Sequence, residues 1–508
     1  MVLLLAAFAS FYFSARYAPK PAAPLPSAPP AGHTVTAPTS ATPDQPVAAT
    51  QGRPRPPPSR RSGPAEKVTL ANEFIVVTFT NHGGAIDSVA LKKHLAVQGE
   101  SAPYTLNSIQ AAPALSLRDF PGADRNTAFT LVSKTDTEVV YRATTESLEI
   151  TRRYILAKAP DRDDYQIRHE TTFRNLTGKP LALPRAVFNL GTAAPLSPTD
   201  YGLYLSTGYG DGTDTKFVAR NDLQGGGFLS WVGLKDGAPP AFLDRPAAIQ
   251  WVTVKNQFFA FILTPDQPGV GVRIERVKLD PHAPVDDARL YGVTGYAQFD
   301  LKPLAAGASE TFGANFFAGP KEYKRLSNPD VFKHGEEKVM QFDSFFFNKI
   351  FFSGFFAPLL LTIMNWVHSV VPNWGWAIII TTLSLKIIFL PLTLAASRSA
   401  KRMAKLQPHM TALREKYKDN PQKMQTETMR IFKENKVNPV GGCIPVLITI
   451  PFFVAFFAML QSNSELRFAS FLWVKDPFRP PTRWRASSAS RSTSCRCCSA
   501  PRPSSRCA

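Results

Sequence analysis

The chain has 508 residues, and 58 Lys and Arg against 39 Asp and Glu give it a formal net charge of +19. This length allows two or three domains, and such a charge suits nucleic acid or an anionic membrane surface. No phosphate-binding loop, zinc-spaced Cys and His set or nucleic-acid-binding motif occurs, so we expect no cofactor, no metal and no specific nucleic acid. Four of the five cysteines lie in the last fourteen residues, which leaves the body without a disulfide framework.

The first 65 residues predict a membrane segment and a linker. Residues 1–17 begin with the apolar run "MVLLLAAFASFYF", which is shorter than the roughly 20 residues of a full span. We expect a membrane segment whose true start lies upstream, with a signal peptide as the alternative. Residues 18–65 are rich in Pro, Ala, Ser and Thr, which predicts an extended linker.

Residues 66–320 have the pattern of an antiparallel all-β domain. The stretch "EFIVVTFTNHGGAIDSVAL" alternates β-branched and aromatic residues around the turn signal at 81–84. Similar runs follow at short spacing, which predicts a sandwich. Its His residues are scattered and no carboxylate pair has a defined spacing, so a binding or scaffold role is favoured over an enzyme.

Residues 321–374 contain a charged stretch and then an apolar helical stripe. Asn365 and His368 give the second part a polar side, so it predicts juxtamembrane helices lying in the membrane interface. Periodicity alone leaves a span of its own open.

Two transmembrane helices are predicted after this region, at 375–394 and 441–461. The first has Trp374 and Trp376 at one end as interfacial anchors. Its 20 residues make about 30 Å of helix, enough to cross the hydrocarbon core.

The segment between the spans, 395–440, predicts a basic cytoplasmic hairpin of two short helices. Residues 397–438 hold eleven Lys or Arg against four Asp or Glu, and so basic a short loop stays in the cytoplasm. Pro421 and Asn438-Pro439 are the expected helix breakers. A merely solvated basic face is the alternative.

Lys386 places a positive charge inside the first span. Thr382, Lys386 and Thr393 are spaced i, i+4 and i+11, so they share one helical stripe. Lys386 lies about 12 Å below the cytoplasmic end, too deep for simple snorkelling. We therefore predict that it faces protein or water and not lipid, and pairing with an acid elsewhere in the protein is the alternative.

Four stretches resemble, in order and spacing, the membrane protein insertases of the YidC/Oxa/Alb3 family: "NWGWAIIITTLSLKIIFLPLT", "KLQPHMTALREKY", "KVNPVGGCIPVLITIPFFVAFFAML" and "SELRFASFLWVKDP". The resemblance implies a multi-pass protein of the bacterial inner membrane with a large periplasmic β-sandwich domain. It places 351–371 along the periplasmic face and makes 462–477 a periplasmic loop. Five core helices of the family form a hydrophilic groove open to the cytoplasm and to lipid, without nucleotide consumption or catalytic residues.

The same resemblance assigns roles to residues of this chain. The partners it implies are nascent membrane proteins, the Sec translocon, the ribosome or signal-recognition targeting machinery, and the lipid bilayer. Lysine at position 386 departs from the family's usual arginine, which keeps the charge but loses the planar fork of donors. The implied groove residues are Lys386, Thr382, Thr393 and Ser384, the groove-wall helix contributes Pro445, Thr449 and Pro451, and the cytoplasmic contact uses Arg398, Lys401, Arg402, Lys405, Arg414 and Lys416.

Residues 478–508 do not continue the resemblance. This tail is rich in Arg, Ser, Cys and Pro and has no apolar periodicity. Shifting Ser and Cys codons by one base produces Phe, Leu, Ile, Met and Val codons, so we expect a frameshifted tail and an incomplete helical core. A redox or metal site of Cys495, Cys497 and Cys498 is the alternative.

Two other functions are compatible with the pattern. One is a membrane-anchored periplasmic carbohydrate-binding or sugar-modifying protein built on the β domain. The other is a transporter that uses Lys386 as a substrate counter-ion. Sugar binding by the β domain, or uptake that follows an ion gradient, would separate these from an insertase.

Overall fold

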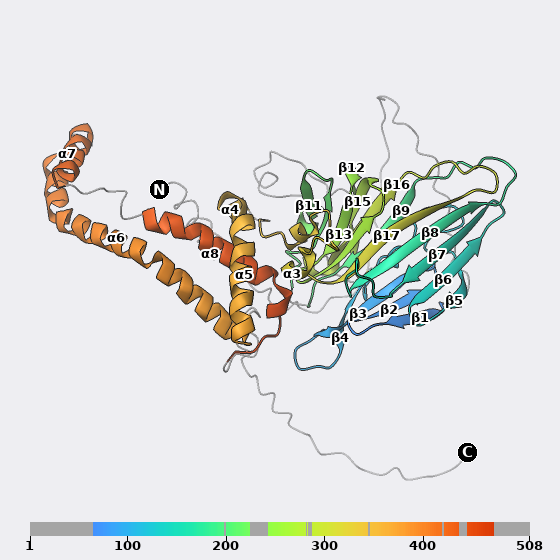
Figure 1. The fold of residues 1–508 in the computed structure, drawn as a ribbon. Helices are drawn as coiled ribbons and strands as arrows, with labels where there is room; N and C mark the ends of the chain where they lie inside the picture. Colours follow the sequence, from blue (N-terminus) through green and yellow to red (C-terminus); the bar gives the residue numbers. More distant parts are fainter. Residues whose placement is uncertain are drawn as a thin grey trace, which may run out of the picture. The chain divides into compact units, whose positions relative to one another are not determined.

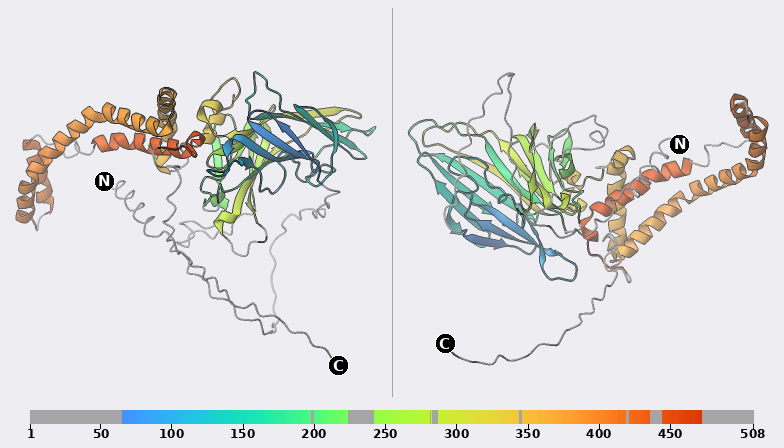
Figure 2. Two further views of the ribbon diagram at one scale, coloured as in Figure 1. Left: turned by 90° about the horizontal axis from the view of Figure 1, so that it is seen from below. Right: turned by 180° about the vertical axis from the view of Figure 1, so that it is seen from behind.

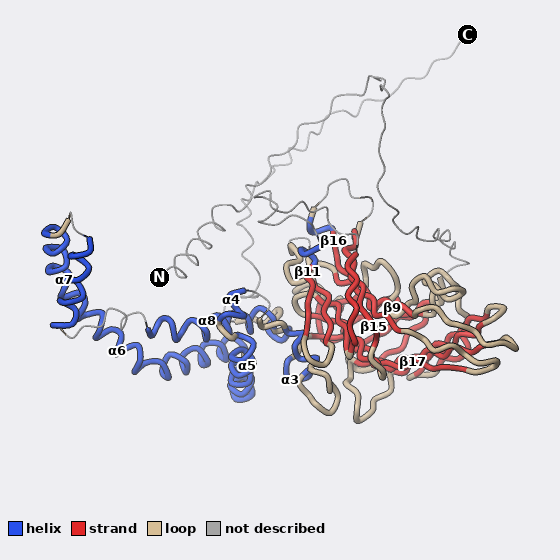
Figure 3. Tube along the Cα trace, turned by 90° about the horizontal axis from the view of Figure 1, so that it is seen from above, coloured by secondary structure: helices blue, strands red, loops and turns tan. Residues whose placement is uncertain are grey.

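The fold is described from a computed structural model. It describes residues 65–197, 200–223, 242–280, 282, 287–343, 346–418, 421–435 and 444–471. The predictions for the first membrane segment, most of the linker and the tail at 478–508 lie outside these residues. Strands occupy 67–320 and helices longer than one turn occupy 346–462 (Figure 3).

The N-terminal strands form a four-stranded antiparallel sheet in the order β1-β2-β3-β4 (Figure 1). Buried and part-exposed residues alternate along the first five residues of β2, as expected for a strand with one face in the core. The strands are Lys67–Ala71 (β1), Ile75–Thr80 (β2), Ala85–Leu95 (β3) and Pro103–Leu106 (β4).

A nine-stranded sheet dominates the domain, and its neighbouring strands are antiparallel throughout (Figures 1 and 2). Its order is β11-β10-β13-β14-β17-β8-β7-β6-β5. The strands are Ser206–Gly210 (β10), Thr215–Ala219 (β11), Trp251–Lys255 (β13), Phe259–Pro265 (β14), Ser309–Pro320 (β17), Gln166–Asn175 (β8), Leu148–Ile155 (β7), Glu138–Thr144 (β6) and Thr130–Lys134 (β5).

A second four-stranded sheet, in the order β12-β15-β16-β9, packs against β13 and β14. On the opposite side, the Trp251 indole N–H donates to the His334 carbonyl at 3.0 Å. Covered on both faces, β13 is buried along its whole length. The strands are Phe242–Ile249 (β12), Gly269–Lys278 (β15), Tyr291–Phe299 (β16) and Ala186–Ala193 (β9). The predicted all-β sandwich is confirmed.

The sequence Asn81-His82-Gly83-Gly84 forms the predicted turn. Gly83 and Gly84 have φ values of 70° and 52°, and a Cβ on Gly84 would lie 2.9 Å from the Phe129 ring. The buried Arg152 guanidinium donates to the Gly83 carbonyl at 2.5 Å, and the Tyr154 hydroxyl donates to the Gly84 carbonyl at 2.7 Å. Side chains of β7 therefore hold the turn in the core.

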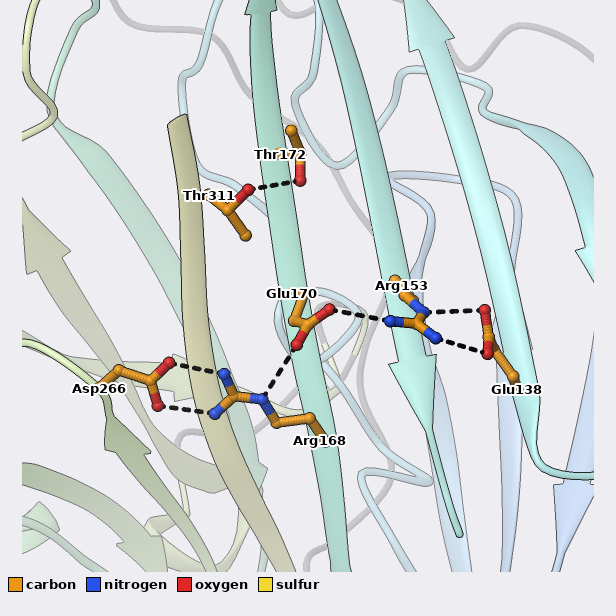
Figure 4. A network of polar contacts seen from close by, with 7 residues as sticks. All are labelled: Glu138, Arg153, Arg168, Glu170, Thr172, Asp266 and Thr311. Atoms are coloured by element: carbon orange, nitrogen blue, oxygen red, sulfur yellow. Dashed lines mark hydrogen bonds and ion pairs between the residues drawn. The ribbon is translucent and has the colours of Figure 1, made fainter. Parts of the chain in front are cut away.

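A ladder of alternating charges crosses the solvent face of the nine-stranded sheet (Figure 4). Arg168 pairs with Asp266 at 2.6 Å and contacts Glu170 at 3.4 Å. Arg153 contacts Glu170 at 3.4 Å and Glu138 at 2.9 Å. Such cross-strand pairs stabilise a sheet modestly and keep this face polar.

The C-terminal half is helical. Helices α5 and α8 pack together, and both contact α6. The helices are Tyr323–Leu326 (α3), Phe346–Ile350 (α4), Ser353–Val370 (α5), Trp374–Lys416 (α6), Pro421–Glu434 (α7) and Ile444–Ser462 (α8), with 3₁₀ turns at Arg220–Leu223 (η1), Ala288–Leu290 (η2), Glu336–Met340 (η3) and Ser464–Leu466 (η4).

Helix α6 differs from the prediction of a span followed by two short helices. It runs 43 residues without interruption, so the first arm of the expected hairpin continues the predicted span. Residues 395–405 are rich in Ala, Arg, Lys and Met, which are strong helix formers, and contain no Gly or Pro that would end the helix. The second arm, α7, begins at Pro421, where proline suits a first helical position.

Candidate functional site

The first turn of α6 fixes one end of the predicted span. The Asn373 side chain accepts hydrogen bonds from the N–H groups of Gly375 and Trp376 at 3.0 and 3.3 Å, as an N-cap does. A Cβ on Gly375 would lie 2.0 Å from the Phe471 ring, and Trp376 meets the same ring edge-on at 5.6 Å. Position 375, the second residue of α6, is therefore glycine, because the Phe471 ring occupies the space that a side chain would need.

Lys386 is exposed on α6, three turns into the helix. Among the described residues, no carboxylate lies within 4.0 Å of its ammonium group. The large exposed side chains around it in this stretch are apolar, namely Leu383, Ile387, Ile388, Leu390 and Leu394. Lys386 is thus an unpaired charge on an apolar helix surface.

The hydroxyl residues predicted beside Lys386 divide between two sides of α6. Thr382 and Thr393 lie within 40° of Lys386 around an ideal helix, and their hydroxyls donate to the carbonyls of Ile379 and Phe389 at 2.8 and 2.9 Å. Ser384 lies about 160° from Lys386 and donates to Ile380 at 2.8 Å. The helix therefore brings Thr382 and Thr393 together with Lys386, and Ser384 faces away.

A proline that was not assigned a role adds a polar group beside Lys386. Pro391 lies inside α6 and has no N–H to donate to the carbonyl of Ile387, four residues earlier. That carbonyl belongs to the residue next to Lys386. The signal was available in the sequence as a proline five residues after the lysine.

The predicted groove-wall helix, α8, packs against α5 and α6 through Phe452. The Phe452 ring lies 4.4 Å from Phe356 of α5 and 4.9 Å from Phe389 of α6. Thr449 and Pro451 are half-buried in α8. Pro451 lies inside α8 and has no N–H to donate to a carbonyl one turn earlier, whereas the role implied for Pro445 stays a prediction.

The six basic residues predicted for cytoplasmic contact lie in α6 beyond the span. All six are exposed, and none has an ion pair among the residues that the structure describes. In α7, Arg430 instead pairs with Glu427 and Glu434, each at 3.2 Å. The six positions are Arg398, Lys401, Arg402, Lys405, Arg414 and Lys416.

The segment after α8 contacts the β domain, a junction that the sequence did not reveal. Gln257 donates to the Gln461 carbonyl at 3.0 Å, and the Ser464 hydroxyl donates to the Lys321 carbonyl at 3.2 Å. Asn463, Ser464 and Leu466 are buried there. The end of α8 is therefore held at the edge of the β domain.

The charged groups of this junction are partly desolvated. Arg467 lies 5.4 Å from the Tyr104 ring and 5.3 Å from the Phe259 ring. Burial and the charge of Arg467 lower the pKa of His94 to about 4. Burial, followed by the charge of Glu322, raises the pKa of Glu465.

Length and composition allow two described helices to cross a membrane, Ser353–Val370 and Trp374–Ala395. The stretch Ile448–Ser462 of α8 is a shorter apolar helix. Because α5 passes this test, its expected position in the interface stays a prediction.

Comparison with known proteins gives matches over both halves of the chain. The profile of the YidC periplasmic domain matches residues 67–353, and that of the 60Kd inner membrane protein matches residues 366–480. A galactose mutarotase-like protein from Lactobacillus casei aligns in structure with 50% of this chain and 100% of its own, at 12% identity and a TM-score of 0.31.

Curated relatives match along most of the chain. The membrane protein insertase YidC of Chlorobaculum tepidum is 30% identical over 433 residues, covering 82% of this chain and 67% of that protein. The insertase of the same name from Cupriavidus necator is 29% identical over 449 residues, covering 85% and 73%. The chain belongs to the YidC family of membrane protein insertases.

Proposed function

We propose that Lys386 is the central cation of a hydrophilic groove through which polar segments of nascent membrane proteins enter the bilayer. One observation carries the proposal: in a helix able to span a membrane, an exposed lysine has no acidic partner among the described residues. A charge at the centre of a span costs about 2.5–3.5 kcal/mol on insertion scales. A wet groove removes most of that cost by keeping the ammonium hydrated.

The chemistry of the groove is electrostatic attraction without bond making. An ammonium attracts acidic and polar parts of a client segment as a point charge, without the two-pronged geometry of a guanidinium. The lone pairs of Thr382 and Thr393 and the Ile387 carbonyl supply further hydrogen-bond acceptors along the same stretch. We assign no catalytic residue and no cofactor to this step.

We infer a topology in which the basic end of α6 is cytoplasmic and the β domain is periplasmic. The six unpaired cations favour the cytoplasmic side, where positive loops are retained. The segment after α8 contacts Lys321 at the edge of the β domain, and the start of α6 contacts Phe471 of the same segment, so both outer ends lie on one side of the spans. This supports a multi-pass protein of the inner membrane.

Two kinds of exposed side chain on α6 suit different partners. The exposed cations of α6 suit the ribosome, the signal-recognition machinery or anionic headgroups on the cytoplasmic side. The exposed apolar side chains of α6 suit lipid, a client helix or the Sec translocon. We do not propose the carbohydrate-binding alternative, because the relatives that match across both halves are insertases.

Replacement of Lys386 in a frame-corrected gene, expressed in cells depleted of their own insertase, tests the role of the charge. We expect Lys386→Arg to support insertion of clients with acidic translocated segments, and Lys386→Glu to reduce it at least tenfold. Clients with uncharged translocated segments should be affected much less by either change. Equal insertion of acidic clients by both variants, at equal protein levels, would exclude the charge from the mechanism.

A further inference from the structure

A hollow of about 360 Å³ lies between α3 and the second half of α5. This volume is within the range of small-molecule sites, roughly 300–1,000 Å³. Its lining consists of Tyr323, Lys324, Ser327, Thr362, Asn365, Trp366 and Ser369. Each lining side chain carries a hydrogen-bonding group, and the lining contains one cation and no carboxylate.

Lys324 brings a positive charge to the hollow. Its side chain is exposed and forms no ion pair among the described residues. Glu465 lies near enough to feel the charge of Lys324, but it does not line the hollow. A lysine ammonium is a suitable point charge for a phosphate group.

The α5 side of the hollow offers acceptors instead of charge. The Asn365 side-chain oxygen is buried and has no hydrogen-bond partner in the described part of the chain. The hydroxyls of Thr362 and Ser369 donate to the carbonyls of Pro358 and Trp366 at 2.9 and 2.7 Å, so their lone pairs remain available. A complementary ligand therefore carries a hydrogen-bond donor close to its phosphate.

The position of the hollow matches the outer surface of the bilayer. Helix α5 ends at Val370, and α6 begins four residues later at Trp374, whose ring stacks on His368 at 3.8 Å. Trp366 is 69% exposed at the rim and Trp376 is 47% exposed at the start of α6. Tryptophan gathers at this level of a membrane, where its ring is half in the headgroup region.

We propose that this α3–α5 hollow binds the headgroup of a phospholipid that carries a hydrogen-bond donor, such as phosphoglycerol or phosphoethanolamine. The phosphate is held by Lys324, and the hydroxyl or ammonium donor reaches the exposed hydroxyl oxygens of Thr362 and Ser369. The proposal rests on the topology given above and is independent of Lys386. A bound headgroup at this place anchors the junction between the β domain and α5 to the outer leaflet.

Photolabelling of the full chain in nanodiscs tests the proposal. The probes are phosphatidylglycerol, phosphatidylethanolamine and phosphatidylcholine, each with a photoactivatable group at the headgroup end of an acyl chain. We expect adducts on the peptides that contain 323–327 and 362–369, at least threefold more from the first two lipids than from phosphatidylcholine, which has a phosphate but no donor. Equal labelling by all three lipids would overturn the proposal.

Two variants identify the contacts. Lys324→Gln should reduce the adducts at least threefold, whereas the matched control Lys333→Gln, an exposed lysine outside the hollow, should not. The double change Thr362→Val and Ser369→Ala removes the exposed acceptor hydroxyls and should abolish the preference over phosphatidylcholine. Unchanged labelling in Lys324→Gln, or loss of the adducts when millimolar inorganic phosphate is added, would contradict a lipid headgroup site.

The same assay separates this proposal from the groove mechanism. Lys386→Glu should leave the adducts unchanged, since Lys386 does not line the hollow. Adducts that disappear in Lys386→Glu but persist in Lys324→Gln would contradict the α3–α5 site while leaving the groove proposal intact.

Discussion

The Arg467 guanidinium donates to the carbonyl of Leu95 at 2.6 Å, across 372 residues of chain. It also donates to the carbonyl of Ala96 at 2.9 Å. Leu95 ends β3, and Arg467 follows the turn after α8. One side chain thus joins the end of a predicted span to the N-terminal sheet of the β domain.

Arg467→Ala should loosen this junction. Loss of hydrogen bonds from a charged donor costs about 1.5–3 kcal/mol, so hydrogen exchange at 95–96 and 104–106 should accelerate roughly 10- to 100-fold. Arg174→Ala is the control, because Arg174 is a solvent-exposed arginine of β8 whose ion pair with Glu149 is long, at 3.9 Å. Unchanged exchange at 95–96 in Arg467→Ala would show that the contact contributes nothing.

The junction should weaken in acid through His94. The pKa of His94 is lowered to about 4 in the folded state, below its ordinary value of 6.5, so the unfolded chain binds more protons between these values. Stability should therefore fall as the pH drops from about 6.5 to about 4. Thermal unfolding of the full chain in detergent should show this slope, and His94→Gln should flatten it. A slope that persists unchanged in His94→Gln would assign it to other groups.

Lys321 should produce a second pH dependence of stability, on the alkaline side of neutral pH. It is buried beside the buried Lys255, and desolvation lowers its pKa to about 7. The folded state therefore binds fewer protons than the unfolded state between about pH 7 and 10.5, so stability should rise with pH in this window. Lys321→Met should reduce the rise and raise the melting temperature at pH 7, and the remaining rise should come from Lys255, whose pKa is also lowered by burial. The same rise in Lys321→Met would rule out this origin.

Gly375→Ala should disturb the start of α6. The added methyl group would overlap the Phe471 ring, and such overpacking costs about 1–3 kcal/mol. Gly354→Ala in α5 is the matched control, since its Cβ would meet ordinary contacts beginning at 3.6 Å. We expect a red shift of tryptophan emission and a lower melting temperature for Gly375→Ala alone. Identical melting of both variants would contradict the packing described for Phe471.

The sequence predicts local features of this fold better than distant ones. Alternation along β2 and the glycines at 83–84 are local signals, and both the strand and the turn follow from them. The neighbour relation of β14, β17 and β8 depends on pairing residues such as Phe261 with Ala318, which no local pattern encodes. The contact of Arg467 with Leu95 escapes prediction for the same reason.

In the candidate site, too, the sequence predicts local features better than distant ones. The stripe of Thr382, Lys386 and Thr393 follows from helical spacing alone. The family resemblance adds Ser384 to this set, although its spacing of two residues from Lys386 turns it to the other side of α6.

Water access to position 386 tests the central claim most directly. Lys386→Cys, in a chain whose native cysteines are replaced by serine, would be labelled with a water-soluble maleimide in intact proteoliposomes, next to the exposed apolar control Ile388→Cys. Maleimide reacts with the thiolate, which does not form in hydrocarbon. The groove predicts labelling at 386 at least tenfold faster than at 388, with protection by a client that carries an acidic segment. Equally slow labelling at both positions would mean that position 386 is dry and would contradict the proposed mechanism.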